Sequence, residues 1–167
     1  EGLPASQPAR TPTAPDPSLP TALLITEDDC KLEDFAPGTI VASATLASSA
    51  LRSPRPVSDL VHRFEALALA DAAARLDLRP GALTAKDPAD LAKWAAKSGA
   101  RQIATGFVPR GPLRDWLDAA EPALAASGIS LTEWQRDWDT AIWPHATAGF
   151  FKVKKAIPRI VQDLGLQ

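Results

Sequence analysis

The chain has 167 residues, the length of one domain, and it carries 18 lysine and arginine residues against 20 aspartate and glutamate residues, a formal net charge of -2. This balance argues against a protein whose whole surface holds nucleic-acid phosphates. No apolar run approaches the length of a membrane span, so no membrane partner is expected. The single cysteine, Cys30, excludes an internal disulfide framework and fits a reducing compartment, which predicts a cytoplasmic location.

Residues 1–20 contain six of the 16 prolines and few large apolar side chains. Such a segment cannot bury enough surface to offset its ordering entropy, so a Pro-rich, disordered linker is predicted before a single α/β domain at 21–167. The chain also begins with Glu1 rather than Met. Together these features favour a further domain upstream over a flexible natural terminus.

From Thr21 onward, short apolar runs alternate with helical patterns. The runs predict strands at 22–26, 39–43, 101–105 and 129–134. Capping residues and a 3.6-residue periodicity predict helices at 58–76, 87–99 and 111–128, and at 143–165 after an irregular start and with an interruption near Pro158. This alternation predicts right-handed βαβ units, and therefore a three-layer, Rossmann-like α/β domain with a mainly parallel sheet of four to five strands and helices on both faces.

The helix predicted at 58–76 has an apolar face at helical spacing. Its members are Leu60, Phe64, Leu67, Ala68, Ala72 and Leu76.

Ligands of an open parallel sheet bind outside the carboxyl ends of its strands. These ends are predicted to carry Glu27 and Asp28, then Ser43 and Ala44, then Thr105 and Gly106, with Arg110 on the same rim. A cofactor-binding rim is therefore expected at Glu27, Asp28, Thr105, Gly106 and Arg110. The acids at 27–29 suit Mg²⁺, but a solvated acidic loop is favoured and no metal is predicted. Likewise, prolines within 106–112 favour a tight turn over a phosphate cradle.

His145 follows Trp143 and Pro144, where Asp137 or Asp139 could orient its ring. The sequence has no strained nucleophile motif such as GxSxG, and two histidines and one cysteine make a zinc site unfavourable. We therefore predict structural roles for His145 and Trp143 and name no catalytic residue. The tryptophans at 116–143 are interpreted as core filling rather than as an electron relay.

Three basic residues share one face of the last predicted helix, at Lys152, Lys155 and Arg159, opposite an apolar face. This pattern is typical of an amphipathic surface helix. A sharper alternative is a face that docks a partner or a nucleic acid.

Four segments in this order resemble the α/β antenna domain of the photolyase/cryptochrome family. They are 64–76, 90–106, the pair 113–115 with 128–129, and 149–155. The segment at 143–151 is also similar to bacterial photolyase-like proteins in which a helical flavin-binding domain comes first. The resemblance covers roughly residues 21–165.

The resemblance implies an accessory, non-catalytic domain of a flavoprotein that repairs DNA with light or senses blue light. The flavin-binding helical domain would be its partner, as part of the same parent chain or as a separate subunit. FAD would be held there, with no cofactor in this domain, and DNA would be contacted only through the parent. The alternative is a stand-alone small nucleotide-binding protein or enzyme that uses the strand-edge rim.

Overall fold

Five parallel strands form one sheet in the order β3-β2-β1-β4-β5. The computed structural model describes residues 9–166. The strands are β1 (Thr21–Thr26), β2 (Ile40–Ala47), β3 (Gly81–Thr84), β4 (Gln102–Gly106) and β5 (Ser130–Trp134). The chain builds outward from β1 to β3 and then returns to place β4 on the other side of β1. The strand order therefore reverses between β1 and β4, which makes their carboxyl ends the expected ligand position of this architecture.

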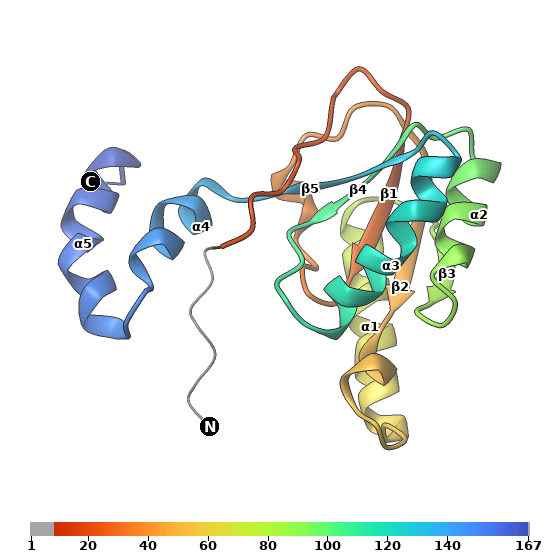
Figure 1. The fold of residues 1–167 in the computed structure, drawn as a ribbon, viewed down its shortest axis with the longest axis horizontal. Helices are drawn as coiled ribbons and strands as arrows, with labels where there is room; N and C mark the ends of the chain where they lie inside the picture. Colours follow the sequence, from red (N-terminus) through yellow and green to blue (C-terminus); the bar gives the residue numbers. More distant parts are fainter. Residues whose placement is uncertain (1–8, 167) are drawn as a thin grey trace. The chain divides into compact units, whose positions relative to one another are not determined.

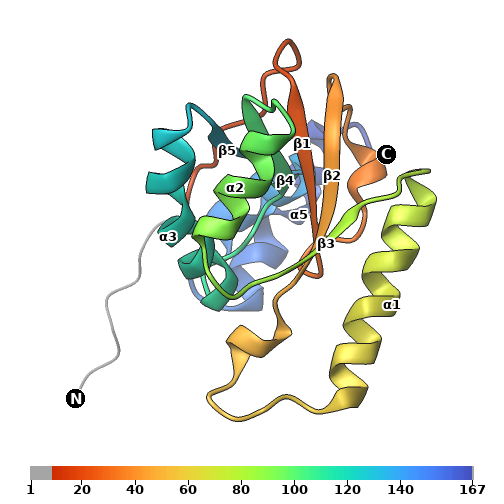
Figure 2. The ribbon, with the colours of Figure 1, turned by 90° about the vertical axis from the view of Figure 1, so that its right-hand side faces the viewer.

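Helices cover both faces of this sheet, as Figure 2 shows. On one face lie α2 (Ala89–Lys97) and α3 (Pro112–Ala126), whose buried apolar side chains pack against Ala22, Leu24 and Ile103. On the other face, α1 (Asp59–Arg75) and the 3-10 turn η1 (Leu32–Asp34) cover Leu23 and Ile25. Because both faces are covered, every residue of β1 is buried. The predicted three-layer, Rossmann-like fold is confirmed.

The elements differ from the prediction in four places, and one of them is a helix at Asp137–Ile142 that was not predicted. The second strand, β2, continues to Ala47, four residues beyond its predicted end, and β3 was not predicted at all. The predicted interruption near Pro158 is also wrong, because α5 (Phe150–Asp163) runs through this proline. Ile160 in the following turn is buried, and this packing supports the helix where the proline removes a backbone hydrogen bond.

Helix α1 begins and ends within one residue of its prediction, but only part of the predicted apolar face is buried. Leu60, Phe64 and Leu67 of the predicted apolar face are 77%, 74% and 62% exposed. The side that packs on the sheet contains Ala72 of the predicted face together with Glu65, Leu69 and Ala73. Helix α1 thus has apolar side chains on two sides, and one of these sides is exposed to solvent.

The predicted linker falls partly on residues 1–8, which lie outside the described residues. Within the described part, residues 13–20 are hydrogen-bonded to the sheet. The Gln102 side chain accepts a hydrogen bond from the Asp16 amide at 3.0 Å and donates one to the Asp16 carbonyl at 2.7 Å. The Thr13 carbonyl accepts a hydrogen bond from the Glu133 amide of β5 at 2.9 Å. Specific contacts to the sheet therefore begin before Thr21.

The chain divides into two units, of which the sheet and its helices form one, at Thr13–Trp134. In the other unit, α4 (Asp137–Ile142) leads through the 3-10 turn η3 (Trp143–His145) into α5 (Figure 1). Among residues 9–166, no helix combines the length and the apolar character needed to cross a bilayer.

Candidate functional site

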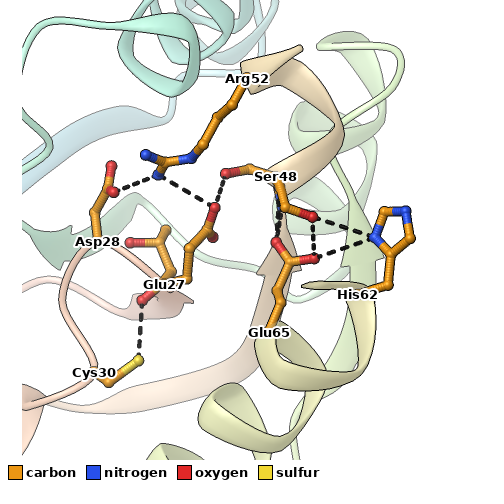
Figure 3. Close-up of polar contacts among 9 residues, drawn as sticks. Glu27, Asp28, Cys30, Ser48, Arg52, His62 and Glu65 are labelled. Atoms are coloured by element: carbon orange, nitrogen blue, oxygen red, sulfur yellow. Dashed lines mark hydrogen bonds and ion pairs between the residues drawn. The ribbon is translucent and has the colours of Figure 1, made fainter. Parts of the chain in front are cut away.

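Polar side chains gather where β1 and β2 end, as Figure 3 shows. Glu27 and Asp28 directly follow β1. Ser48 follows β2 and opens the 3-10 turn η2 (Ser49–Arg52). Two further side chains reach the cluster from α1, and they are His62 and Glu65. The topology explains this gathering, because the carboxyl ends of parallel strands share one edge of the sheet and α1 begins on the same side.

The first half of the cluster is an ion pair between the two strand ends. The Arg52 guanidinium lies 2.5 Å from Asp28 Oδ1 and 3.4 Å from Glu27 Oε1. Its hydrogen bond to Asp28 is the main reason that the pKa of Arg52 is raised. The Ser48 hydroxyl donates a hydrogen bond to the same Glu27 oxygen. Glu27 and Asp28 are thus bound to η2 rather than directed at open solvent.

The second half centres on Glu65 of α1, whose charged side chain is buried. Its Oε1 accepts hydrogen bonds from the Ser48 and Ser49 amides at 2.7 and 2.8 Å, and its Oε2 accepts one from the Ser49 hydroxyl at 2.7 Å. Burial acts to raise the pKa of Glu65, but the hydrogen bonds from Ser49 and Ser48 outweigh it and hold the pKa below its usual value. The carboxylate therefore fixes the start of η2 to α1.

His62 stands beside this carboxylate but does not form a catalytic relay with it. Its Nδ1 lies 3.2 Å from the Ser49 hydroxyl oxygen and 3.8 Å from Glu65 Oε2. In a Ser–His–acid triad, opposite ring nitrogens face the nucleophile and the acid. Here one nitrogen faces both, and the Ser49 hydroxyl donates to Glu65. This geometry suits a structural hydrogen-bond cluster and does not activate the serine.

At the switch point between β1 and β4, an acidic side chain lies over the strand end. A β-carbon added at Gly106 would lie 2.6 Å from Asp29 Oδ2, so this glycine is needed for the close approach of the Asp29 carboxylate. With Glu27 and Asp28 nearby in the same loop, the place where related folds accept phosphates carries negative charge.

Three buried oxygen atoms near these strand ends have no hydrogen-bond partner among the residues that the structure describes. They are Oγ1 of Thr26, Oγ1 of Thr105 and Oε2 of Glu27. Buried polar atoms are usually satisfied in proteins, by water where no protein group is available. They mark the part of this edge where a water or a small polar molecule would gain hydrogen bonds.

The residues of the predicted cofactor-binding rim differ in their surroundings. Arg52 binds Glu27 and Asp28 together, whereas Thr105 is fully buried within β4. Gly106 is covered by Asp29, and Arg110 lies exposed in the loop before α3.

The predicted place of Ser43 and Ala44 at the end of the second strand is wrong, because β2 continues past them. Ser48 and Ser49 take that position.

The loop between β4 and α3 is held by a buried ion pair that the sequence analysis did not single out. Glu133 of β5 accepts a hydrogen bond from the Val108 amide at 2.8 Å and lies 3.3 Å from Arg114 Nη1. Arg114 Nη2 also lies 2.6 Å from Asp118 and 2.9 Å from Glu121. The spacing of Arg114, Asp118 and Glu121 at i, i+4 and i+7 was the available signal.

The remaining predicted residues lie in the second unit, which contains α4, η3 and α5. His145 is exposed at the end of η3, and Trp143 is half-buried at its start. Lys152, Lys155 and Arg159 are exposed on α5. Their predicted roles stay predictions.

No known protein-family model matches the chain, and no curated protein matches it significantly.

Proposed function

We propose that this chain is an accessory, non-catalytic α/β domain of a photolyase/cryptochrome-like flavoprotein, and that it packs against the helical domain that holds FAD. The parent would repair DNA with light or sense blue light. The resemblance of the four segments in chain order motivates this proposal, and the Rossmann-like fold of Thr13–Trp134 agrees with it.

The exposed side of α1 carries the proposal. Leu60, Phe64 and Leu67 lie at i, i+4 and i+7 on one side of the helix, and each is more than half exposed. Scattered apolar residues are normal on a protein surface, but a contiguous group along one helix marks an interaction site. Two of the three, Phe64 and Leu67, fall in the segment at 64–76, one of those that carry the resemblance. An α/β domain that packs against a second domain would require such a face.

The carboxyl edge of the sheet argues against the alternative of a nucleotide-binding enzyme. Glu27 and Asp28 are bound to Arg52 and Ser48, and the Asp29 carboxylate lies against Gly106 at the switch point. A nucleotide phosphate would meet negative charge there and would have to displace internal hydrogen bonds. The edge thus supports a scaffold better than a site for an anionic substrate.

The test is to measure flavin in the free chain and in the native assembly. The tagged full chain is purified from its source cells under mild conditions, and FAD is released by acid and quantified by fluorescence. We expect the chain produced alone to be colourless and to show no binding of FAD or ATP in a titration. The native assembly should release FAD in a one-to-one ratio.

A double variant, Leu60→Ser with Phe64→Ser, should lower the recovered FAD at least tenfold by removing apolar contact area. Val41→Ser serves as the matched control, since Val41 is an exposed apolar residue of β2 and not of α1. Stoichiometric FAD on the isolated chain, saturable ATP binding, or a native assembly without flavin would each overturn the proposal.

A further inference from the structure

We propose that the basic face of α5 binds the sugar–phosphate backbone of single-stranded DNA. This inference rests on the proposed function, because it takes the parent to act on DNA, and it assigns to this chain a DNA contact of its own. The face consists of Lys152, Lys155 and Arg159, with Lys154 and Phe151 beside them.

The charges on α5 suit a polyanion. The helix contains four basic residues and one acidic residue, Asp163, which lies 3.4 Å from Arg159. The three residues of the basic face are spaced at i, i+3 and i+7, so they line one side of the helix over roughly 10 Å. Each of the three side chains is exposed.

An aromatic side chain extends this basic surface. Phe151 is 74% exposed and directly precedes Lys152, and one helical turn later its side of the helix carries Lys154 and Lys155. Its ring packs edge-on against Phe150, with the ring centroids 5.8 Å apart. Exposed aromatic rings among lysines are typical of proteins that bind single strands, where unpaired bases stack on the rings and the cations hold the phosphates.

The packing of α5 favours DNA over a lipid surface. A helix that lies in a membrane interface buries its apolar side in the lipid. In α5 most of that side is covered, since Ile160 is buried and Val153, Val161 and Leu164 are half-buried, although Phe150 and Ile157 are 64% and 38% exposed. The basic side, which suits phosphates in water, is exposed at each of its residues.

The experiment measures fluorescence anisotropy of a labelled oligothymidine of about 20 nucleotides, a length that covers at least one binding site, with the full chain between about 50 and 200 mM salt. The triple variant K152A/K155A/R159A should weaken binding and reduce the slope of log K against log salt by about 2, which is three lost contacts at about 0.7 each. The triple variant K93A/K97A/R101A removes equal charge elsewhere and should leave the slope unchanged.

A second pair of variants tests the aromatic contribution. Phe151→Ala should weaken binding about tenfold through lost stacking. Phe150→Ala, which changes the ring on the apolar side of α5, should have a smaller effect.

Duplex DNA and vesicles with anionic lipid are the comparison probes. No binding of the native chain to the oligonucleotide, a salt slope that the α5 triple variant leaves unchanged, or tighter binding to vesicles than to the oligonucleotide would each overturn the proposal. Because this experiment involves no flavin, its failure leaves the FAD result of the native assembly intact.

Discussion

The two faces of the sheet are covered by helices of different kinds. Helices α2 and α3 bury Leu91, Leu117 and Leu124 in the larger core cluster, and apart from the buried Arg114 no charged residue of theirs is buried. Helix α1 contributes Leu69 and two alanines to a smaller cluster on the other face and leaves large apolar side chains exposed. An amphipathic helix closes the core of a domain, whereas a helix that is apolar on two sides also suits a second partner. The helices on one face of the sheet thus bury their large apolar side chains within the chain, whereas α1 on the other face keeps an apolar side exposed for a partner.

The largest effect should come from the α2–α3 face. Leu117 of α3 is fully buried, so Leu117→Ala removes packed atoms and leaves a cavity. We expect a loss of about 3 kcal/mol in the free energy of unfolding, within the usual range of 2–5 kcal/mol for such changes. Urea denaturation followed by circular dichroism measures it. A loss below about 1 kcal/mol would show that this face is not the main core.

On the α1 face, the strongest single contribution should come from a polar residue. Glu65→Ala leaves the Ser48 and Ser49 amides without their acceptor, and we expect a loss of about 2–3 kcal/mol. Glu121→Ala is a control, since that carboxylate is exposed and forms an ion pair with Arg114. If both variants lower the free energy of unfolding equally, the burial of Glu65 does not strengthen its contribution.

The same carboxylate predicts how stability depends on pH. The pKa of Glu65 is lower in the folded state than its usual value of 4.5, so its contribution is fully present above that value. The contribution is lost as the pH falls through the folded pKa, when the carboxylate takes up a proton. Stability of the native chain should therefore fall more steeply below pH 4.5 than that of Glu65→Gln. The free energy of unfolding of both proteins is measured by urea titration at several pH values. If it falls equally with pH in the native chain and in Glu65→Gln, this assignment is refuted.

A smaller effect is expected where the N-terminal segment meets the sheet. The Gln102 amide group makes a pair of hydrogen bonds with the Asp16 backbone and also donates one to Thr21 Oγ1 at 2.8 Å. Gln102→Ala should cost about 1–2 kcal/mol. It should also speed amide hydrogen exchange at Asp16, while Ser127→Ala, which removes an exposed hydroxyl bond, should not. Unchanged exchange at Asp16 would show that these hydrogen bonds do not hold the segment.

Local patterns in the sequence predicted the layers of the fold but not which side of α1 is buried. Apolar runs and caps fixed most strands and helices, because these signals lie within a few residues. In α1, however, Leu67 and Leu69 are both apolar and lie on opposite sides, so periodicity alone does not select the buried side. The end of β2 was missed because its last four residues, 44–47, contain a single large apolar side chain, Leu46. That error also hid Ser48 and Ser49 from the predicted site.

The site itself depends on contacts that no local pattern contains. Glu65 reads as an ordinary exposed residue of a helix, and its role follows only from the position of η2, sixteen residues earlier in the chain. The same holds for Asp29 and Gly106, which the sheet brings together from distant segments. Sequence reasoning found the acids after β1 but could not foresee that Arg52 binds them.

The smallest effect should come from the exposed side of α1, and this result would sharpen the contrast between the two faces most directly. Leu67→Ser changes an apolar side chain that is 62% exposed, so little packing is lost in the chain by itself. We expect the free energy of unfolding to change by no more than about 0.5 kcal/mol, the usual range for surface positions. Leu69→Ser, two residues away on the buried side, should cost several times more. If Leu67→Ser destabilises the isolated chain as much as Leu69→Ser, then this side of α1 is already covered in solution. It would then not be available to a flavin-binding partner.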